Sequence, residues 1–198
     1  PDWIITCILN IIYYFFFMSN NYLKKYFSKL NKCISNKENI NLIKKAALDF
    51  KSLGKNKIII FGNGGSAAIA SHFTTDVLKN TNLKCLNLSD TSLLTCLAND
   101  YGYENANSKF LELYGDKNDI LIAISSSGKS LNIINSVISA KKKSFSKIIT
   151  LSGFKKNNKL KKIGDINFWI DSDNYNIIEN SHQVILLTLI DYISNKKY

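Results

Sequence analysis

The sequence predicts an α/β protein in which a parallel five-stranded sheet carries helices on both of its faces. Short, continuous apolar runs bounded by turn residues are typical of strands that are buried on both faces. These runs alternate with longer amphipathic segments, and such alternation is typical of parallel strands joined by crossover helices. The chain has 198 residues, of which 45% are hydrophobic, which is enough for one domain of this class with a full core.

The elements are expected in a regular order. Two helices, over residues 20–36 and 41–53, precede the first strand and show apolar residues at helical spacing. The five strands are expected at residues 57–62, 84–88, 119–124, 147–152 and 165–170. The remaining helices are expected at residues 67–79, 92–99, 105–113, 131–142 and 176–194, with a short lysine-rich helix before the last strand. No repeat or linker divides residues 18–198, which we therefore predict to be a single domain.

Residues 1–17 differ from the rest because the segment from Trp3 to Phe17 is almost wholly apolar. It is shorter than the roughly 20 residues that a membrane span needs, and it lacks the features of a signal peptide. Met18 is the only methionine. We predict that Met18 is the natural start and that residues 1–17 are a non-native or upstream-translated leader, with a membrane anchor as the alternative.

Composition argues against two classes of partner. The formal net charge is +11, but the 26 basic residues are all lysines, and arginine is the preferred reader of guanine and phosphate in nucleic-acid-binding proteins. We therefore expect no nucleic acid, and the short apolar segment described above leads us to expect no membrane partner. The four cysteines include no CxxC pair, which favours idle thiols in a reducing cytoplasm over a zinc knuckle or a redox motif.

Two turns are predicted to bind anions. The first, Gly62-Asn63-Gly64-Gly65-Ser66, joins an apolar strand to a helix, and it leaves backbone N–H groups free at the helix N-terminus. An ordinary tight turn is the alternative. The second, Ser125-Ser126-Ser127-Gly128-Lys129-Ser130, lies in the same position after another strand and adds hydroxyl groups. Neither turn has the spacing of a Walker A loop or a dinucleotide fingerprint, so a small phosphorylated ligand is predicted.

The only two histidines each have a carboxylate on their own helix face. His72 and Asp76 are four residues apart, and Glu179 and His182 are three apart, so each pair of side chains lies side by side. Two histidines and two carboxylates could bind zinc or transfer protons near neutral pH. Incidental surface or packing pairs are the alternative.

These motifs, together with His72-Phe73, Asn99-Asp100-Tyr101-Gly102 and Thr150-Leu151-Ser152-Gly153, resemble those of the sugar isomerase (SIS) domain family, and within it the phosphoheptose isomerase branch. The resemblance covers residues 20–193. It implies a flavodoxin-like sheet and a cytoplasmic homotetramer with sites between subunits. It also implies an aldose–ketose isomerase that converts sedoheptulose 7-phosphate to D-glycero-D-manno-heptose 7-phosphate through an enediolate.

The resemblance also assigns roles to individual residues. It implies that the sugar phosphate is bound by Ser125, Ser126, Ser127 and Ser130, and that the sugar is lined by Asn63, Gly64, Gly65, Asn99 and Asp100. It implies zinc ligands at His72, Asp76 and Glu179, with Glu179 also at the substrate. Asp76 is our candidate for the catalytic base, and His182, Glu179 or a metal is expected to handle the oxygen protons and the enediolate charge.

Three positions depart from the family pattern. Asp76 replaces a glutamate and Glu179 replaces a glutamine, whereas Leu187 stands where the family has its second catalytic histidine. His182 is five residues before Leu187, about 140° around a helix, so it can serve only in a shifted site. Leu187 favours the alternative function, a non-catalytic SIS module that binds a phosphosugar or a protein partner such as a replication initiator.

Overall fold

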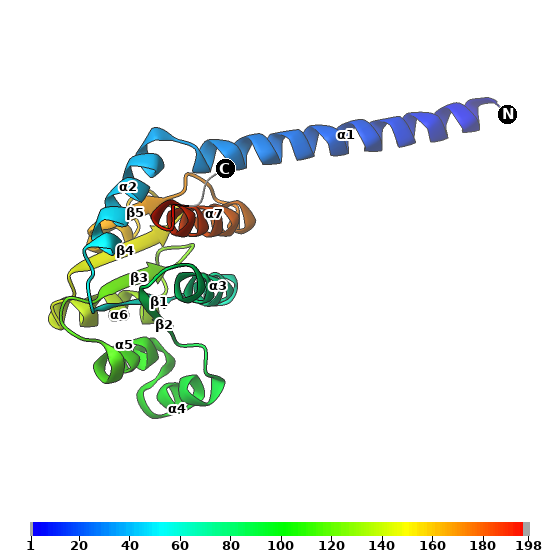
Figure 1. Ribbon diagram of the computed structural model, residues 1–198. Coiled ribbons are helices and arrows are strands. Elements are labelled where there is room, and N and C mark those ends of the chain that lie inside the picture. The colour runs from blue at the N-terminus through cyan, green and yellow to red at the C-terminus, as the bar shows by residue number, and fades with distance from the viewer. Residues whose placement is uncertain (1, 196–198) are drawn as a thin grey trace.

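A computed structural model describes residues 2–195, although the side chains of residues 2–4, 9, 10 and 12–19 lie outside that description. Over this range five parallel strands form one sheet in the order β2-β1-β3-β4-β5, with helices on both faces (Figure 1). The strands are β1 (Lys57–Phe61), β2 (Lys84–Asn87), β3 (Ile120–Ile124), β4 (Lys147–Ser152) and β5 (Ile166–Trp169). The helices are α1 (Asp2–Ile34), α2 (Lys37–Lys51), α3 (Gly65–Asn80), α4 (Thr91–Tyr101), α5 (Tyr103–Tyr114), α6 (Leu131–Lys142), the short 3₁₀ helix η1 (Lys161–Ile163) and α7 (Tyr175–Ile193). The predicted fold class is confirmed.

The strand order places the two predicted anion-binding turns side by side. The order is that of flavodoxin-like sheets, in which the chain reverses its direction of winding between β1 and β3. Those strands are direct neighbours, with Ile58 paired to Ile120 and Phe61 to Ala123. Ligands of open α/β sheets bind outside the carboxyl ends of the strands at this reversal, and both turns begin there.

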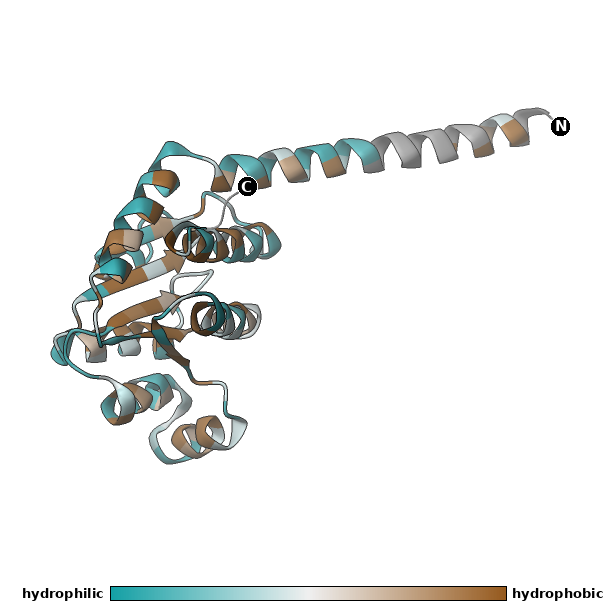
Figure 2. Ribbon diagram, viewed as in Figure 1, coloured by the Kyte–Doolittle hydropathy of each residue, from teal (hydrophilic) through white to brown (hydrophobic). Residues whose placement is uncertain are grey.

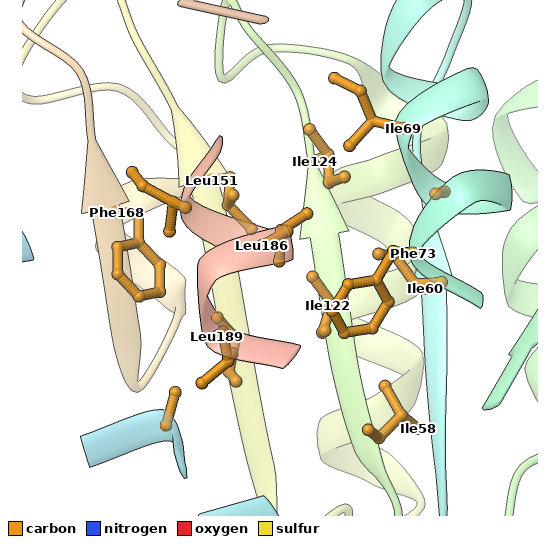
Figure 3. Close-up of a cluster of buried hydrophobic side chains, with 14 of the residues drawn as sticks. Ile58, Ile60, Ile69, Phe73, Ile122, Ile124, Leu151, Phe168, Leu186 and Leu189 are labelled. Carbon is orange, nitrogen blue, oxygen red and sulfur yellow. The ribbon is translucent and has the colours of Figure 1, made fainter. Parts of the chain in front are cut away.

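The core lies on both faces of the sheet because successive strand residues point to opposite sides. Ile58 and Ile60 belong to the cluster under α2, α3 and α7, whereas Ile59 and Phe61 belong to the cluster under α4, α5 and α6. Figure 2 shows the strands as hydrophobic, and Figure 3 shows side chains of α3 and α7 packed on the first of these clusters. The prediction of strands buried on both faces is confirmed for β1, β3 and β4, whereas the edge strands β2 and β5 are only partly buried.

Helix α1 differs from its prediction. One helix runs from Asp2 to Ile34, and its N-terminal part projects away from the sheet (Figure 1). The expected start at residue 20 is therefore wrong, because no helix-breaking residue separates the apolar segment from the amphipathic one. Most side chains of residues 1–17, and that of Met18, lie outside the described part, so the leader and the start at Met18 stay predictions.

In the part of the chain that the structure describes, no helix combines the length and the hydropathy that a membrane crossing requires.

Most other boundaries of the helices and strands differ from the expected ones by one to four residues. The largest difference is at residues 100–104, which separate the helices expected at residues 92–99 and 105–113. Asp100 instead continues α4, and only Gly102, with φ 80°, separates α4 from α5. A single residue at positive φ is enough to end one helix and begin the next, because glycine adopts that conformation without steric cost.

Candidate functional site

The two turns are joined through a pair of asparagines. Asn63, in the glycine turn, and Asn132, in the first turn of α6, exchange two hydrogen bonds: each Nδ2 donates to the other's Oδ1, at 2.9 and 2.8 Å. The Tyr103 hydroxyl of α5 also donates to Asn63 Oδ1, at 3.0 Å. Both asparagine amides are thereby held in one orientation, and the two turns are fixed relative to each other.

The serine turn presents hydroxyl groups and free N–H groups together. Ser125 Oγ lies 2.9 Å from Ser130 Oγ, and Ser127 Oγ accepts a hydrogen bond from the Lys129 N–H at 3.3 Å. Ser130 is the N-cap of α6, yet its side chain makes no capping hydrogen bond within the described chain. The first N–H groups of α6 therefore lack a side-chain acceptor, which leaves them available to an anion.

Gly128 gives the serine turn its tight path. Its φ is 65°, a conformation that disfavours any residue with a Cβ. A Cβ at this position would also lie 2.7 Å from Asn158 Cβ and closer still to the Asn158 amide. Asn158 in turn binds Ser152 Oγ and the Gly153 carbonyl. The turn is therefore closely packed against the loop that follows β4.

A cavity of about 160 Å³ lies between the turns and α7. Its lining includes Ser126, whose buried Oγ has no hydrogen-bond partner among the residues that the structure describes. A buried hydroxyl without a partner loses free energy relative to one exposed to water, so a ligand atom is expected to satisfy it. The complete lining comprises Asn63, Ser66, Ile124, Ser125, Ser126, Ser127, Ser130, Tyr175 and Glu179.

Glu179 lies over the start of α3. A Cβ on Gly65 would come within 3.0 Å of Glu179 Cδ, and its carboxylate oxygens lie against the same point. The N-cap of α3 is Gly64, which has no side chain to cap the first N–H groups of the helix. A carboxylate at a helix N-terminus is favoured by the helix dipole. The Glu179 carboxylate thus faces the N-terminus of α3 in the glycine turn and also borders the cavity that the serine turn lines.

A second cavity, of about 300 Å³, borders the other side of Asn63. It is lined by Gly62, Gly64, Ser71, Asn87 and Tyr103, among others. Asn63 therefore lies between a small serine-lined cavity and a larger mixed one.

The predicted pair of His72 and Asp76 is present on α3. His72 Nε2 lies 3.5 Å from Asp76 Oδ2, and the two side chains are 48% and 30% exposed. His72 Nδ1 lies 3.4 Å from the amide nitrogen of Gln183 on α7. The pair is therefore open to solvent and is linked to α7 by Gln183.

This pair fits two ligand positions of a zinc ion. Two donors on one tetrahedral zinc, each about 2.1 Å from the metal, are separated by about 3.4 Å, close to the 3.5 Å observed. The expected third ligand, Glu179, does not join them: no group of three or more His, Cys, Asp or Glu side chains suited to a metal occurs in the described residues. The structure thus brings together two of the three predicted ligands.

His182 does not lie with these groups. It is fully buried, and its Nε2 lies 3.3 Å from the Ser152 carbonyl oxygen of β4. Burial lowers the pKa of His182 to about 4, with the Ser152 contact partly opposing that shift. It is absent from the linings of both cavities described above. As placed, it packs in the core beneath α7, and the expected contact with substrate has no support from its position.

Asn99 and Asp100 were also expected at the sugar. Both are exposed on α4, where Asn99 Nδ2 donates to Asp100 Oδ1 at 2.9 Å. Neither lines the two cavities beside Asn63. Within one chain, the structure therefore does not bring them to the serine turn.

Four residues near the site were not predicted: Gln183, Asn132, Tyr103 and Tyr175. A signal existed for Gln183, because it follows Glu179 by four residues and so shares its side of the helix. None existed for the others, since their contacts join elements that are distant in the sequence.

Comparisons with known proteins identify the family of the chain. Residues 21–153 match the profile of the SIS domain. A phosphoheptose isomerase of Sulfurimonas denitrificans is 36% identical over 182 residues, covering 88% of this chain and 92% of the relative. That of Histophilus somni is 41% identical over 133 residues, covering 63% of this chain and 67% of the relative.

A solved structure gives the same result. The structure of a phosphoheptose isomerase from Francisella tularensis superposes with a TM-score of 0.81 at 27% identity, covering 90% of this chain and 97% of that one. The fold, the paired turns and these relatives together lead to one conclusion: the chain belongs to the SIS domain family and, within it, is related to the phosphoheptose isomerases.

Proposed function

We propose that this protein is an aldose–ketose isomerase that converts sedoheptulose 7-phosphate to D-glycero-D-manno-heptose 7-phosphate. The observation that carries the proposal is the serine-lined cavity at the point where the sheet reverses, with the unpartnered Ser126 hydroxyl in its wall. Hydroxyl and N–H donors at a helix N-terminus suit a phosphate group. The relatives named phosphoheptose isomerase supply the substrate class.

The distance along α3 suits a long sugar. Asp76 is ten residues beyond Ser66 on this helix, which is about 15 Å along its axis. An open-chain seven-carbon sugar 7-phosphate extends about 10 Å from phosphorus to its first carbon, since an extended chain advances ~1.2 Å per bond. The Asp76 side chain shortens the remaining gap. A sugar phosphate anchored at the serine turn would therefore have its reacting carbons toward His72 and Asp76.

The proposed chemistry needs one base and a stabiliser of negative charge. Asp76 removes a proton from C1 of the ketose, the C2 carbonyl oxygen gains negative charge, and an enediolate forms. The O1 hydroxyl proton passes to O2, which leaves an aldehyde at C1 and a hydroxyl at C2, and the Asp76 carboxyl group returns its proton to C2, so that the aldose leaves with all atoms balanced. His72, whose Nε2 faces Asp76, keeps that carboxylate in position.

Zinc remains part of the proposal. His72 and Asp76 would hold the ion, with its other ligands coming from groups outside the observed pair. A zinc ion in such a site polarises a carbonyl oxygen and so eases removal of the neighbouring proton.

We also propose a cytoplasmic homotetramer. Its support is the exposed apolar surface of α1, where Tyr22, Leu23 and Phe27 are about half to two-thirds exposed. Exposed apolar patches of this kind usually mark contacts with another protein surface.

Turnover tests the proposal directly. The protein is incubated with sedoheptulose 7-phosphate, with and without zinc, and the aldoheptose 7-phosphate is sought by NMR. Product formation is expected. Saturable binding without product would support the alternative of a non-catalytic phosphosugar-binding module, and neither binding nor product would contradict the assigned ligand.

The variant Ser126→Ala is expected to separate binding from folding. Its stability should stay unchanged or rise slightly, because the lost hydroxyl has no partner in the described structure. Affinity for sedoheptulose 7-phosphate should fall about 10-fold or more, since hydrogen bonds to charged groups contribute roughly 1.5–3 kcal/mol. Calorimetric titration and thermal unfolding measure the two effects.

The matched control is Ser136→Ala. Ser136 is also buried, but its Oγ donates to the Ile133 carbonyl at 2.7 Å. Affinity should be unchanged in this variant. Equal affinity in Ser126→Ala and the parent protein would show that the serine turn does not bind the phosphate.

A further inference from the structure

Gln183 is the residue of α7 that reaches the His72–Asp76 pair. Its amide nitrogen lies 3.4 Å from His72 Nδ1, while His72 Nε2 lies 3.5 Å from Asp76 Oδ2. The imidazole is therefore contacted at both ring nitrogens, by α7 on one side and by its own helix on the other. Gln183 is half-buried, whereas His72 is exposed. The less mobile Gln183 side chain therefore restrains the more exposed imidazole of His72.

The neighbours of Gln183 on α7 cannot take this place. Glu179, one turn earlier, lies over Gly65 at the start of α3. Leu187, one turn later, packs against the core and carries no polar atom. His182, the adjacent residue, is buried with its Nε2 at the Ser152 carbonyl. Among the described residues of α7, Gln183 is thus the side chain that forms a hydrogen bond with His72.

We infer that Gln183 is a positioning residue, which fixes the orientation and tautomer of His72 so that Nε2 faces Asp76. A neutral imidazole has one donor nitrogen and one acceptor nitrogen, and the partner of one decides the role of the other. As placed, the Gln183 amide donates to Nδ1, so Nε2 carries the proton and points it toward the Asp76 carboxylate.

The same residue suits the zinc-bound state, and this part of the inference rests on the proposed function. Histidines that bind a metal through one nitrogen usually donate the other N–H to an acceptor, which orients the ring. A glutamine amide has an oxygen beside its nitrogen. A half-turn of the Gln183 amide would let Oε1 accept the Nδ1 proton, which leaves the Nε2 lone pair for the ion.

The metal-free test reads the tautomer of His72. Long-range ¹H–¹⁵N NMR spectra, recorded well above the ordinary histidine pKa, will contain signals from only His72 and His182, because the chain has 2 histidines. In Gln183→Leu, the two nitrogen shifts of His72 should move toward values typical of a mixture of tautomers, while those of His182 stay fixed. Thr188→Leu, an exposed change on the same helix, should leave both histidines unchanged.

The second test measures zinc affinity by calorimetric titration of the full chain. Gln183→Leu should weaken binding by about 10–100-fold, the usual effect of removing such a partner, and Gln183→Glu, which keeps an acceptor, should restore it to within a few-fold. Unchanged His72 shifts in Gln183→Leu would overturn the inference, as would unchanged zinc affinity in a parent protein that binds zinc. A parent that binds no zinc, but whose His72 signals respond to Gln183→Leu, would contradict only the proposed metal site.

Discussion

Replacing Asp76 with asparagine is expected to lower the turnover of sedoheptulose 7-phosphate by roughly 10²–10⁴-fold, the range over which a positioned acid or base contributes to a reaction rate. Asparagine has nearly the same shape but cannot accept the substrate proton. Because Asp76 is 30% exposed and lies about 15 Å along α3 from the serine-lined cavity, the change should leave folding and phosphate binding nearly intact. The measurement is the initial rate by NMR, with calorimetric affinity alongside.

Asp116→Asn is the matched control for Asp76. Asp116 is exposed and pairs with Lys57 at 2.5 Å, at the start of β1 and so at the opposite end of the sheet. Its replacement should leave turnover unchanged. Turnover in Asp76→Asn within about threefold of the parent would mean that another group serves as the base.

Acidification from pH 6.5 to pH 4 is expected to destabilise the protein through His182. Burial holds the pKa of His182 near 4, below its ordinary 6.5, so between these values the unfolded chain binds a proton that the folded chain does not. The contribution of His182 to the free energy of unfolding is fully present above pH 6.5 and is lost as the pH falls toward 4. The shift corresponds to about 3 kcal/mol at most.

Urea unfolding at a series of pH values measures this effect. In His182→Gln, which cannot titrate, the loss of stability over that window should be smaller by about the same amount. Thr188→Leu, an exposed change on the same helix that keeps both histidines, should leave the pH dependence of the parent unaltered. An identical pH profile in His182→Gln and the parent would contradict the assignment of the acid sensitivity to His182.

The contrast between His182 and Gln183 shows what could be predicted from sequence. Spacing correctly placed Glu179 and His182 on one helix. However, the adjacent residues His182 and Gln183 point about 100° apart, and of these two only Gln183 faces α3. The sequence did contain a signal that His182 is buried. It follows Ile178 by four residues and precedes Leu186 by four, which is the spacing of the apolar stripe that faces the sheet. A histidine within an apolar stripe is better interpreted as a core residue.

Local chemistry predicted the strands and both turns because each depends on a few consecutive residues. The bonds between Asn63 and Asn132 could not be predicted, since these residues are 69 positions apart and meet only after β1 and β3 have paired. Likewise, the length of α1 was missed because a change in composition does not itself end a helix.

The pairing of β1 with β3 has a consequence for how the candidate site assembles. The serine-lined cavity draws on both turns, and the connection between their strands passes through α3, β2, α4 and α5. Contacts of such high sequence separation form slowly, because the loop must close before they stabilise anything. Neither half of the chain contains the cavity. Ligand binding in this cavity therefore requires a fully assembled sheet. A phosphosugar that binds there is expected to stabilise the whole domain against unfolding.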